Sequence, residues 1–430
     1  MVVMTPGFGP GVLMQRLGTA MPWSPKPTPN AEIIYCAPSL DMDDEAFASA
    51  SRLERIVEAC PSVAEPVYKT QPWYSAPVAN SALHSFKRAV KASRAAGPPF
   101  RLRSEVVPGT SGDLAVVWAN DRKTRDLPAD APVVMFMHTI TGDADSTLPL
   151  LRAASKRGWR GCVLVRRGHA GPLRGEPTFN VLGCTRDAAR QVDAVRAAYP
   201  DASFRGLVGV SAGSGLLVSY CGQTGHDAKV DAAVSLCPAY DIETAFKSLG
   251  ETSATVEGLM VGQLKKTFIL PNTQLLRAHD EKALEACLAA TTLDGFIAAH
   301  APFALGRNGA GSAEYYKRAN PMEHFEGVRV PTLVVNSEDD MVCRPENIRC
   351  DLVRQTAGYA LVRTARGSHV AFNEGFFGQG CFMSRLSFDF LDAARATAEE
   401  DARIEEVRGV VVPTKGVEAR AKKKRVEARV

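Results

Sequence analysis

Residues Gly209-Val210-Ser211-Ala212-Gly213 form a G-x-S-x-G motif between two segments of different character. The preceding segment, 204–210, is predicted to be a short buried strand, and the following segment, 214–220, the start of an apolar helix. Small residues beside the serine suit a sharp strand-to-helix turn, where a larger side chain would clash with the neighbouring strand. The stretch therefore predicts a nucleophilic serine on such a turn. A glycine-rich turn that only packs a helix on a sheet would show the same pattern.

The chain on both sides of this motif alternates between short apolar strands and helices. Central strands are expected at 132–137, 161–165, 230–236, 331–336 and 359–363. Such strands, separated by helices, predict a mostly parallel sheet covered on both faces, which is an α/β fold. Two further strands are expected within 101–120, and a last helix over 381–398. Residues 240–320 interrupt the alternation and are expected to form a helical cap.

The domain organisation follows from where this alternation begins and ends. We expect residues 1–100 to be an extension packed on the core, with one amphipathic helix at 42–60. Residues 101–399 are expected to form the main domain, with the cap at about 240–320. Residues 400–430, which include the basic run 422–425, are predicted to be a charged, disordered tail. A clamp and a membrane-contacting arm are both compatible with the extension, so peripheral membrane contact stays open.

The composition is that of a soluble globular protein, with 45% hydrophobic and 23% charged residues. A net charge of +4 over 430 residues does not favour nucleic acid as a partner. No apolar run is long enough to span a membrane, and the first 23 residues do not resemble a secretory signal. The ten cysteines lack C-x-x-C spacing, which favours free thiols and an intracellular, cytoplasmic location. The oligomeric state is not indicated.

A serine nucleophile needs a base within hydrogen-bond reach and an acid that orients the base. Two predicted strands are followed by such residues in the chain order serine, acid, histidine. The strand at 331–336 leads into Asp339 and Asp340, and the strand at 359–363 leads to His369. We predict Ser211 as nucleophile, His369 as base and Asp340 as acid. Asp340 is preferred over Asp339 because its distance from the strand end suits the usual loop.

The negatively charged intermediate of acyl transfer needs two N–H donors, the oxyanion hole. One is expected from Ala212, the residue after the nucleophile. The other is expected from Ile140, in the loop His138-Thr139-Ile140-Thr141-Gly142 after the first central strand. His138 is expected to brace this loop by hydrogen bonds.

These motifs together resemble one branch of the α/β-hydrolases, which contains the bacterial YheT-like esterases and the eukaryotic proteins related to plant embryogenesis-associated proteins. The resemblance covers about residues 100–395. It rests on the 138–142 loop, Arg167-Gly168-His169-Ala170-Gly171, the segment 180–187, Tyr315-Tyr316 and Gly367-Ser368-His369-Val370-Ala371-Phe372-Asn373-Glu374-Gly375. It implies an α/β-hydrolase fold with a mostly parallel twisted sheet, helices on both faces and a helical cap.

The resemblance also implies an activity. It indicates a serine hydrolase that cleaves carboxylic esters of lipophilic acyl groups, including lipid or phospholipid esters, through an acyl-enzyme. A small-molecule or lipid ester is then the substrate, and no metal or organic cofactor is implied. One departure stands out, because Thr139 occupies a position where the branch has glycine. It is compatible with a slower enzyme, an altered loop or no effect, so an inactive scaffold that binds lipid or protein, and an acyltransferase, remain alternatives.

Overall fold

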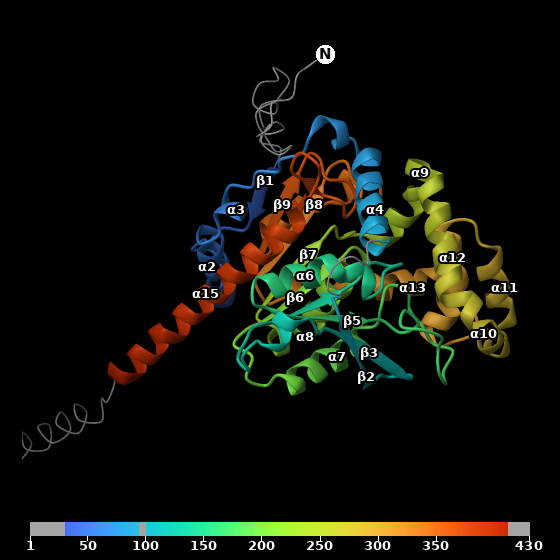
Figure 1. The fold of residues 1–430 in the computed structure, drawn as a ribbon, viewed down its shortest axis with the longest axis horizontal. Helices are drawn as coiled ribbons and strands as arrows, with labels where there is room; N and C mark the ends of the chain where they lie inside the picture. The colour runs from blue at the N-terminus through green and yellow to red at the C-terminus, as the bar shows by residue number, and fades with distance from the viewer. Residues whose placement is uncertain (1–30, 94–99, 412–430) are drawn as a thin grey trace, which may run out of the picture.

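A nine-stranded mixed sheet forms the centre of the molecule (Figure 1). The computed structural model describes residues 31–93 and 100–411. The strand order is β1-β9-β8-β7-β6-β4-β5-β3-β2. The strands are β1 (Ala31–Tyr35), β2 (Leu102–Pro108), β3 (Asp113–Ala119), β4 (Val133–Met137), β5 (Arg160–Val165), β6 (Arg205–Val210), β7 (Ala232–Leu236), β8 (Thr332–Ser337) and β9 (Tyr359–Thr364).

The six strands from β4 to β9 run parallel to one another, whereas β1, β2 and β3 are antiparallel at the two edges. Every residue of β4, β5, β7 and β8 is buried. Strands that are covered on both faces favour apolar side chains at most positions, which explains their largely apolar sequences. The predicted mostly parallel α/β sheet is confirmed.

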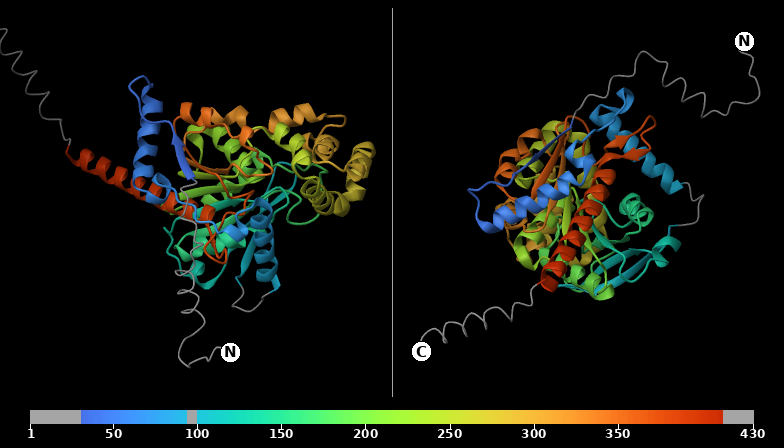
Figure 2. Two further views of the ribbon diagram at one scale, coloured as in Figure 1. Left: turned by 90° about the horizontal axis from the view of Figure 1, so that it is seen from above. Right: turned by 90° about the vertical axis from the view of Figure 1, so that its left-hand side faces the viewer.

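Helices cover both faces of this sheet (Figure 2). One face packs against α2 (Asp44–Glu58), α3 (Pro61–Ala64), α6 (Leu148–Lys156) and α15 (Phe382–Val411). The opposite face packs against α7 (Thr185–Ala198), α8 (Ala212–Thr224) and α14 (Cys350–Gln355). Val134 and Phe136 of β4 point to the first face, and Met135 and Met137 to the second, as the two-residue period of a strand requires.

The insertion between β7 and β8 is helical and gathers at the end of the molecule away from the tip of α15 (Figure 1). It contains α9 (Ile242–Leu264), α10 (Thr273–His279), α11 (Glu281–Ala289), α12 (Leu293–Leu305) and α13 (Ser312–Ala319). Its apolar side chains form a separate hydrophobic cluster, which includes Leu264, Phe268, Phe296 and Phe303. Because the insertion leaves from the carboxyl end of β7, it lies at the edge of the sheet where parallel strands end.

Several elements at the edge of the sheet and outside it were not predicted. β1 pairs antiparallel with β9 at the sheet edge, and a helical turn η1 (Pro72–Tyr74) and helix α4 (Pro77–Ser93) follow. β10 (Asn373–Glu374) and β11 (Gly380–Cys381) form a hairpin before α15. Helix α15 runs to Val411 and not to 398, so the sequence boundary at 400 came too early. Residues 1–30 and 412–430, with the basic run 422–425, lie outside the described residues.

No described helix is both long and apolar enough to cross a bilayer. Short helical segments complete the described chain. They are α5 (Arg122–Arg125), η2 (Asp145–Thr147), η3 (Gly225–Asp227), η4 (Lys265–Ile269), η5 (Leu270–Asn272), η6 (Pro321–Gly327) and η7 (Pro345–Asn347).

Candidate active site

Ser211 occupies a strained turn between β6 and α8. Its backbone lies at φ 54° and ψ −118°, a conformation that costs a residue with a side chain roughly 1–3 kcal/mol. The Ser211 N–H donates to the Leu236 carbonyl at 2.8 Å, which ties the turn to the end of β7. A Cβ on Gly209 would lie 2.4 Å from the Gly213 carbonyl oxygen, and one on Gly213 would lie 2.1 Å from the Met137 carbonyl oxygen. Both glycines are therefore required by close approaches of backbone.

A chain of hydrogen bonds joins the three predicted side chains. Ser211 Oγ lies 2.8 Å from His369 Nε2, and His369 Nδ1 lies 2.8 Å from Asp340 Oδ2. The other oxygen of Asp340 accepts from the N–H groups of Val342 at 2.7 Å and Cys343 at 2.9 Å. Asp340 is buried, so these bonds hold its carboxylate with one oxygen facing the imidazole. A serine nucleophile that is activated by a base and an orienting acid would need such a chain of hydrogen bonds.

Asp339 has a different position from its neighbour. Its Oδ1 accepts from the Ser368 N–H at 2.7 Å, so it holds the loop that carries His369. Burial raises the pKa of Asp339. The structure thus places Asp340, and not Asp339, against the imidazole.

The two backbone donors predicted for the oxyanion hole have no competing partner. Neither the Ile140 N–H nor the Ala212 N–H donates a hydrogen bond within the described part of the chain. Ala212 is the first residue of α8, where the N–H groups of a helix lack internal acceptors and the helix dipole favours negative charge. The close contact of Gly213 with Met137 brings this helix end against the start of the Ile140 loop. Both N–H groups are therefore available at one rim.

Arg166 holds the Ile140 loop from below and was missed in the sequence. This buried side chain donates through Nη1 to the His138 carbonyl at 2.8 Å and through Nη2 to the Thr139 carbonyl at 2.5 Å. It has no carboxylate partner among the described residues, and burial lowers its pKa to about 9, so it stays cationic at neutral pH. The only sequence signal was a charged residue at the end of an apolar strand.

His138 adds a second donor to the same carbonyl. Burial, with the nearby charge of Arg166, holds the pKa of His138 well below its usual value, so the ring is neutral. Its Nε2 accepts from the Arg166 N–H at 3.2 Å, which puts the proton on Nδ1 for donation to the Thr139 carbonyl at 3.0 Å. The Gly142 N–H is the third donor, also at 3.0 Å. The predicted bracing role of His138 is consistent with these contacts.

These three donors determine which way the next N–H points. No peptide in the described chain is cis, and in a trans peptide the C=O and N–H point in opposite directions. The Thr139 carbonyl points into the core, so the Ile140 N–H points out of it. Thr139 itself lies outside the left-handed region, so this loop does not need the glycine that the related branch has there.

Cys237, Asp340 and His369 have ligand atoms within 4.8 Å of one another, so we considered a metal site. Burial raises the pKa of the Cys237 thiol, whereas a metal needs the thiolate. Asp340 and His369 already bond each other through the atoms that would face an ion. The hydrogen-bonded chain to Ser211 accounts for these residues better than a metal does.

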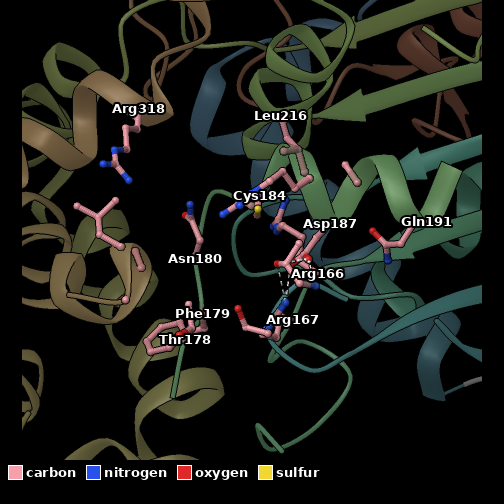
Figure 3. A pocket seen from close by; sticks show the side chains of 18 residues that line it. Arg166, Arg167, Thr178, Phe179, Asn180, Cys184, Asp187, Gln191, Leu216 and Arg318 are labelled. Carbon is pink, nitrogen blue, oxygen red and sulfur yellow. Dashed lines mark hydrogen bonds and ion pairs between the residues drawn. The ribbon is translucent and has the colours of Figure 1, made fainter. Parts of the chain in front are cut away.

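Three hollows lie near the edge of the sheet that carries Ser211, and two of them reach its chain neighbours, Val210 and Ala212. A cavity of about 530 Å³ is lined by Val210 and Val370, which precede Ser211 and follow His369, and by apolar residues of α6 and α15. A polar crevice lies between the cap and the core, where Figure 3 shows Arg318 of α13 across from Arg166, Arg167 and Asp187. It measures about 310 Å³ and adjoins a hollow of about 290 Å³ that reaches Ala212.

Comparison with known proteins gives relatives that match the branch predicted from the motifs. The chain is 25% identical to human "Phospholipase ABHD3" over 318 residues, which is 69% of this chain and 73% of the relative. It is 25% identical to the "Putative esterase YheT" of Escherichia coli, covering 67% and 82%, and 23% identical to the "Embryogenesis-associated protein EMB8" of Picea glauca, covering 61% and 57%. The predicted branch is confirmed.

An esterase structure from Pyrobaculum calidifontis aligns with a TM-score of 0.46 at 16% identity, covering 75% of this chain and 92% of that one. The model of the alpha/beta hydrolase fold family matches residues 132–376, more than half of the chain. The chain therefore belongs to the alpha/beta hydrolase fold family.

Proposed function

We propose that the protein is a serine hydrolase that cleaves carboxylic esters of lipophilic acyl groups through an acyl-enzyme on Ser211. The observation that carries this proposal is the chain of two 2.8 Å hydrogen bonds from Ser211 through His369 to Asp340. The names of the relatives, a phospholipase and a putative esterase, agree with ester hydrolysis.

Each residue has a defined role in this reaction. His369 Nε2 takes the proton of Ser211 Oγ as the oxygen attacks the ester carbonyl, and Asp340 stabilises the imidazolium that forms. The N–H groups of Ile140 and Ala212 hold the oxyanion. His369 then gives the proton to the departing alcohol, and a water, activated by the same imidazole, releases the acid from Ser211.

The two hollows suggest how an ester lies at the nucleophile. The wall of the cavity between α6 and α15 has apolar residues, such as Leu150, Leu236 and Phe388, beside basic ones. Its volume falls within the roughly 300–1,000 Å³ of small-molecule sites, and the apolar part of the wall suits the acyl chain. The 290 Å³ hollow that reaches Ala212 has Arg318, Asn180 and Arg186 in its wall and suits a polar alcohol group. The cap contributes to this hollow, while most of its apolar residues pack against one another.

Covalent labelling tests the nucleophile. We expect a fluorophosphonate probe to label the wild type and the Ser219→Ala variant, which changes another serine of the same helix, but not Ser211→Ala. We expect hydrolysis of aryl esters to disappear in Ser211→Ala as well. Labelling that survives in Ser211→Ala would overturn the assignment. A folded wild type that neither reacts with the probe nor turns over any ester would leave a binding scaffold.

A further inference from the structure

Three large aromatic side chains are exposed together on the described surface. Trp73 of η1 is 52% exposed, and Phe376 and Phe377, at the tip of the β10–β11 hairpin, are 54% and 58% exposed. The Trp73 indole N–H donates to the Phe376 carbonyl at 2.9 Å, and the two phenylalanine rings lie edge to face at 4.9 Å. Adjacent exposed aromatics of this kind mark an interaction site, because isolated exposed apolar residues are normal but clusters are not.

The hairpin that carries these phenylalanines also forms part of the cavity wall. Gln379 and Cys381 line the 530 Å³ cavity, and Gly378 is packed against Leu83 of α4. In the right-hand view of Figure 2, the blue helix α4, the orange-red hairpin and the teal helix α6 lie along the same edge of the molecule. The aromatic cluster therefore lies on a face whose hairpin also forms part of the cavity wall.

The cavity lining carries positive charge and no negative charge. Its basic side chains are His84, Arg152, Lys156, Arg157 and Arg385, and no aspartate or glutamate lines it. Arg157 and Arg385 are ion-paired with acids of the core, whereas Arg152 and Lys156 form no ion pair within the described residues. The excess charge suits an anionic partner.

We propose that this face docks on a negatively charged lipid surface and receives an acyl chain from it into the cavity. Aromatic side chains are suited to the boundary between headgroups and acyl chains, and basic residues are attracted to anionic headgroups. Val210 and Val370, the chain neighbours of Ser211 and His369, line the cavity, so an acyl chain held there would lie beside the nucleophile. The delivery of the chain rests on the proposed function, whereas docking does not.

Vesicle co-sedimentation of the full chain tests docking without any turnover. We expect retention on phosphatidylglycerol-containing vesicles, weaker retention on phosphatidylcholine alone, and release at high salt. Since each basic residue near such a surface contributes about 1 kcal/mol, we expect Lys156→Gln to weaken binding about 5-fold. The double substitution Phe376→Ser with Phe377→Ser is expected to weaken it on both vesicle types.

Matched controls come from the cap, whose apolar side chains form a hydrophobic cluster of their own. Lys282→Gln on α11 and Leu259→Ser on α9 change an exposed lysine and an exposed apolar residue there, and we expect wild-type vesicle binding for both. The phenylalanine variant and both controls are expected to hydrolyse a water-soluble acetate ester as the wild type does. Equal binding by Lys156→Gln, the phenylalanine variant and the controls would overturn docking. So would an absence of vesicle binding together with self-association that the phenylalanine substitutions abolish.

If docking holds while no variant or wild type cleaves any ester, the proposed function fails and the surface assignment stands. If soluble esters are cleaved but the wild type does not bind vesicles, the surface assignment fails and the hydrolase stands.

Discussion

Replacing Arg166 by methionine tests how the oxyanion loop is held. The change removes the guanidinium that donates to the His138 and Thr139 carbonyls and leaves a side chain of similar length in the same buried space. The Thr139 carbonyl keeps its bonds from His138 and Gly142, so the loop loses one of three donors there. The Ile140 N–H then loses part of the restraint that aims it out of the core.

The size of the effect lies between two limits. Complete loss of an oxyanion donor lowers kcat by about 10²–10³, which is the upper limit. A hydrogen bond from a charged donor contributes about 1.5–3 kcal/mol, so its loss from the loop corresponds to roughly 10–100-fold. We expect kcat of Arg166→Met to fall about 10–100-fold with KM little changed, because the restraint acts on charge that develops in the transition state.

Stability should change much less than activity in this variant. A guanidinium buried without a carboxylate costs several kcal/mol of desolvation, so its removal offsets the loss of its bonds to carbonyls. Arg160→Met is the matched control. Arg160 is also a buried arginine that donates only to backbone carbonyls among the described residues, and it begins β5, whereas Arg166 follows the other end of that strand. We expect near-wild-type kcat for this control.

The assay is steady-state kinetics on an aryl ester, together with the affinity for a trifluoromethyl ketone that forms a hemiketal with the serine. For Arg166→Met, we expect the affinity for the ketone to fall in parallel with kcat. Two results would refute the reasoning: a folded Arg166→Met with wild-type kcat, or an equal loss of kcat in Arg160→Met.

Asp340→Asn should lower kcat by on the order of 10⁴, since it disturbs the tautomer of the His369 imidazole. The kcat of Asp339→Asn should stay within about 10-fold of the wild type, because Asp339 contacts the loop that carries His369 and not the imidazole itself. Steady-state kinetics of both variants tests the difference. Gly213→Ala should abolish fluorophosphonate labelling because the new Cβ meets backbone at 2.1 Å, while Gly215→Ala, with its nearest contact at 3.7 Å, should label normally. Burial lowers the pKa of His300 to about 4. As the pH falls through 6.5, the unfolded chain therefore protonates this histidine before the folded protein does, and the free energy of unfolding decreases down to about pH 4. Between pH 7 and 5, the wild type should therefore lose about 2 kcal/mol more unfolding free energy than His300→Phe, measured by urea denaturation; equal losses would show that this ring does not titrate on unfolding.

The central sheet and the three side chains at its edge were predictable because their signals are local. A parallel strand buried on both faces has an apolar sequence whatever its partners are, so β4 to β9 could be located by composition alone. Ser211, Asp340 and His369 each follow such a strand by a few residues. Since parallel strands end at one edge, their loops had to meet there. The structure brings these side chains within hydrogen-bond distance, as expected.

Features that depend on contacts between distant segments were not predictable in the same way. β1 is a short strand whose assignment requires β9, and the β10–β11 hairpin has only two residues in each strand. The cavity needs α6, α15 and the hairpin together, so no single stretch of sequence could indicate it. Arg166 looked like an ordinary charged residue at a strand end, because its burial and its carbonyl partners appear only in three dimensions.

The contacts of Arg166 explain why the loop can have threonine at residue 139. In a loop that depends on glycine, the backbone conformation that presents the donor is one that a Cβ would disfavour, and a substitution there would weaken the site. In this chain the carbonyl of residue 139 is bonded by a buried cation, a neutral imidazole and a backbone N–H, all supplied by residues of the loop and the neighbouring strand. A carbonyl held by three donors leaves the following N–H little freedom, so the loop reaches its orientation through core contacts and not through a flexible residue. Thr139, which made an inactive scaffold an alternative, is therefore compatible with a working oxyanion hole. Substitution of residue 166 should lower kcat more than substitution of residue 139.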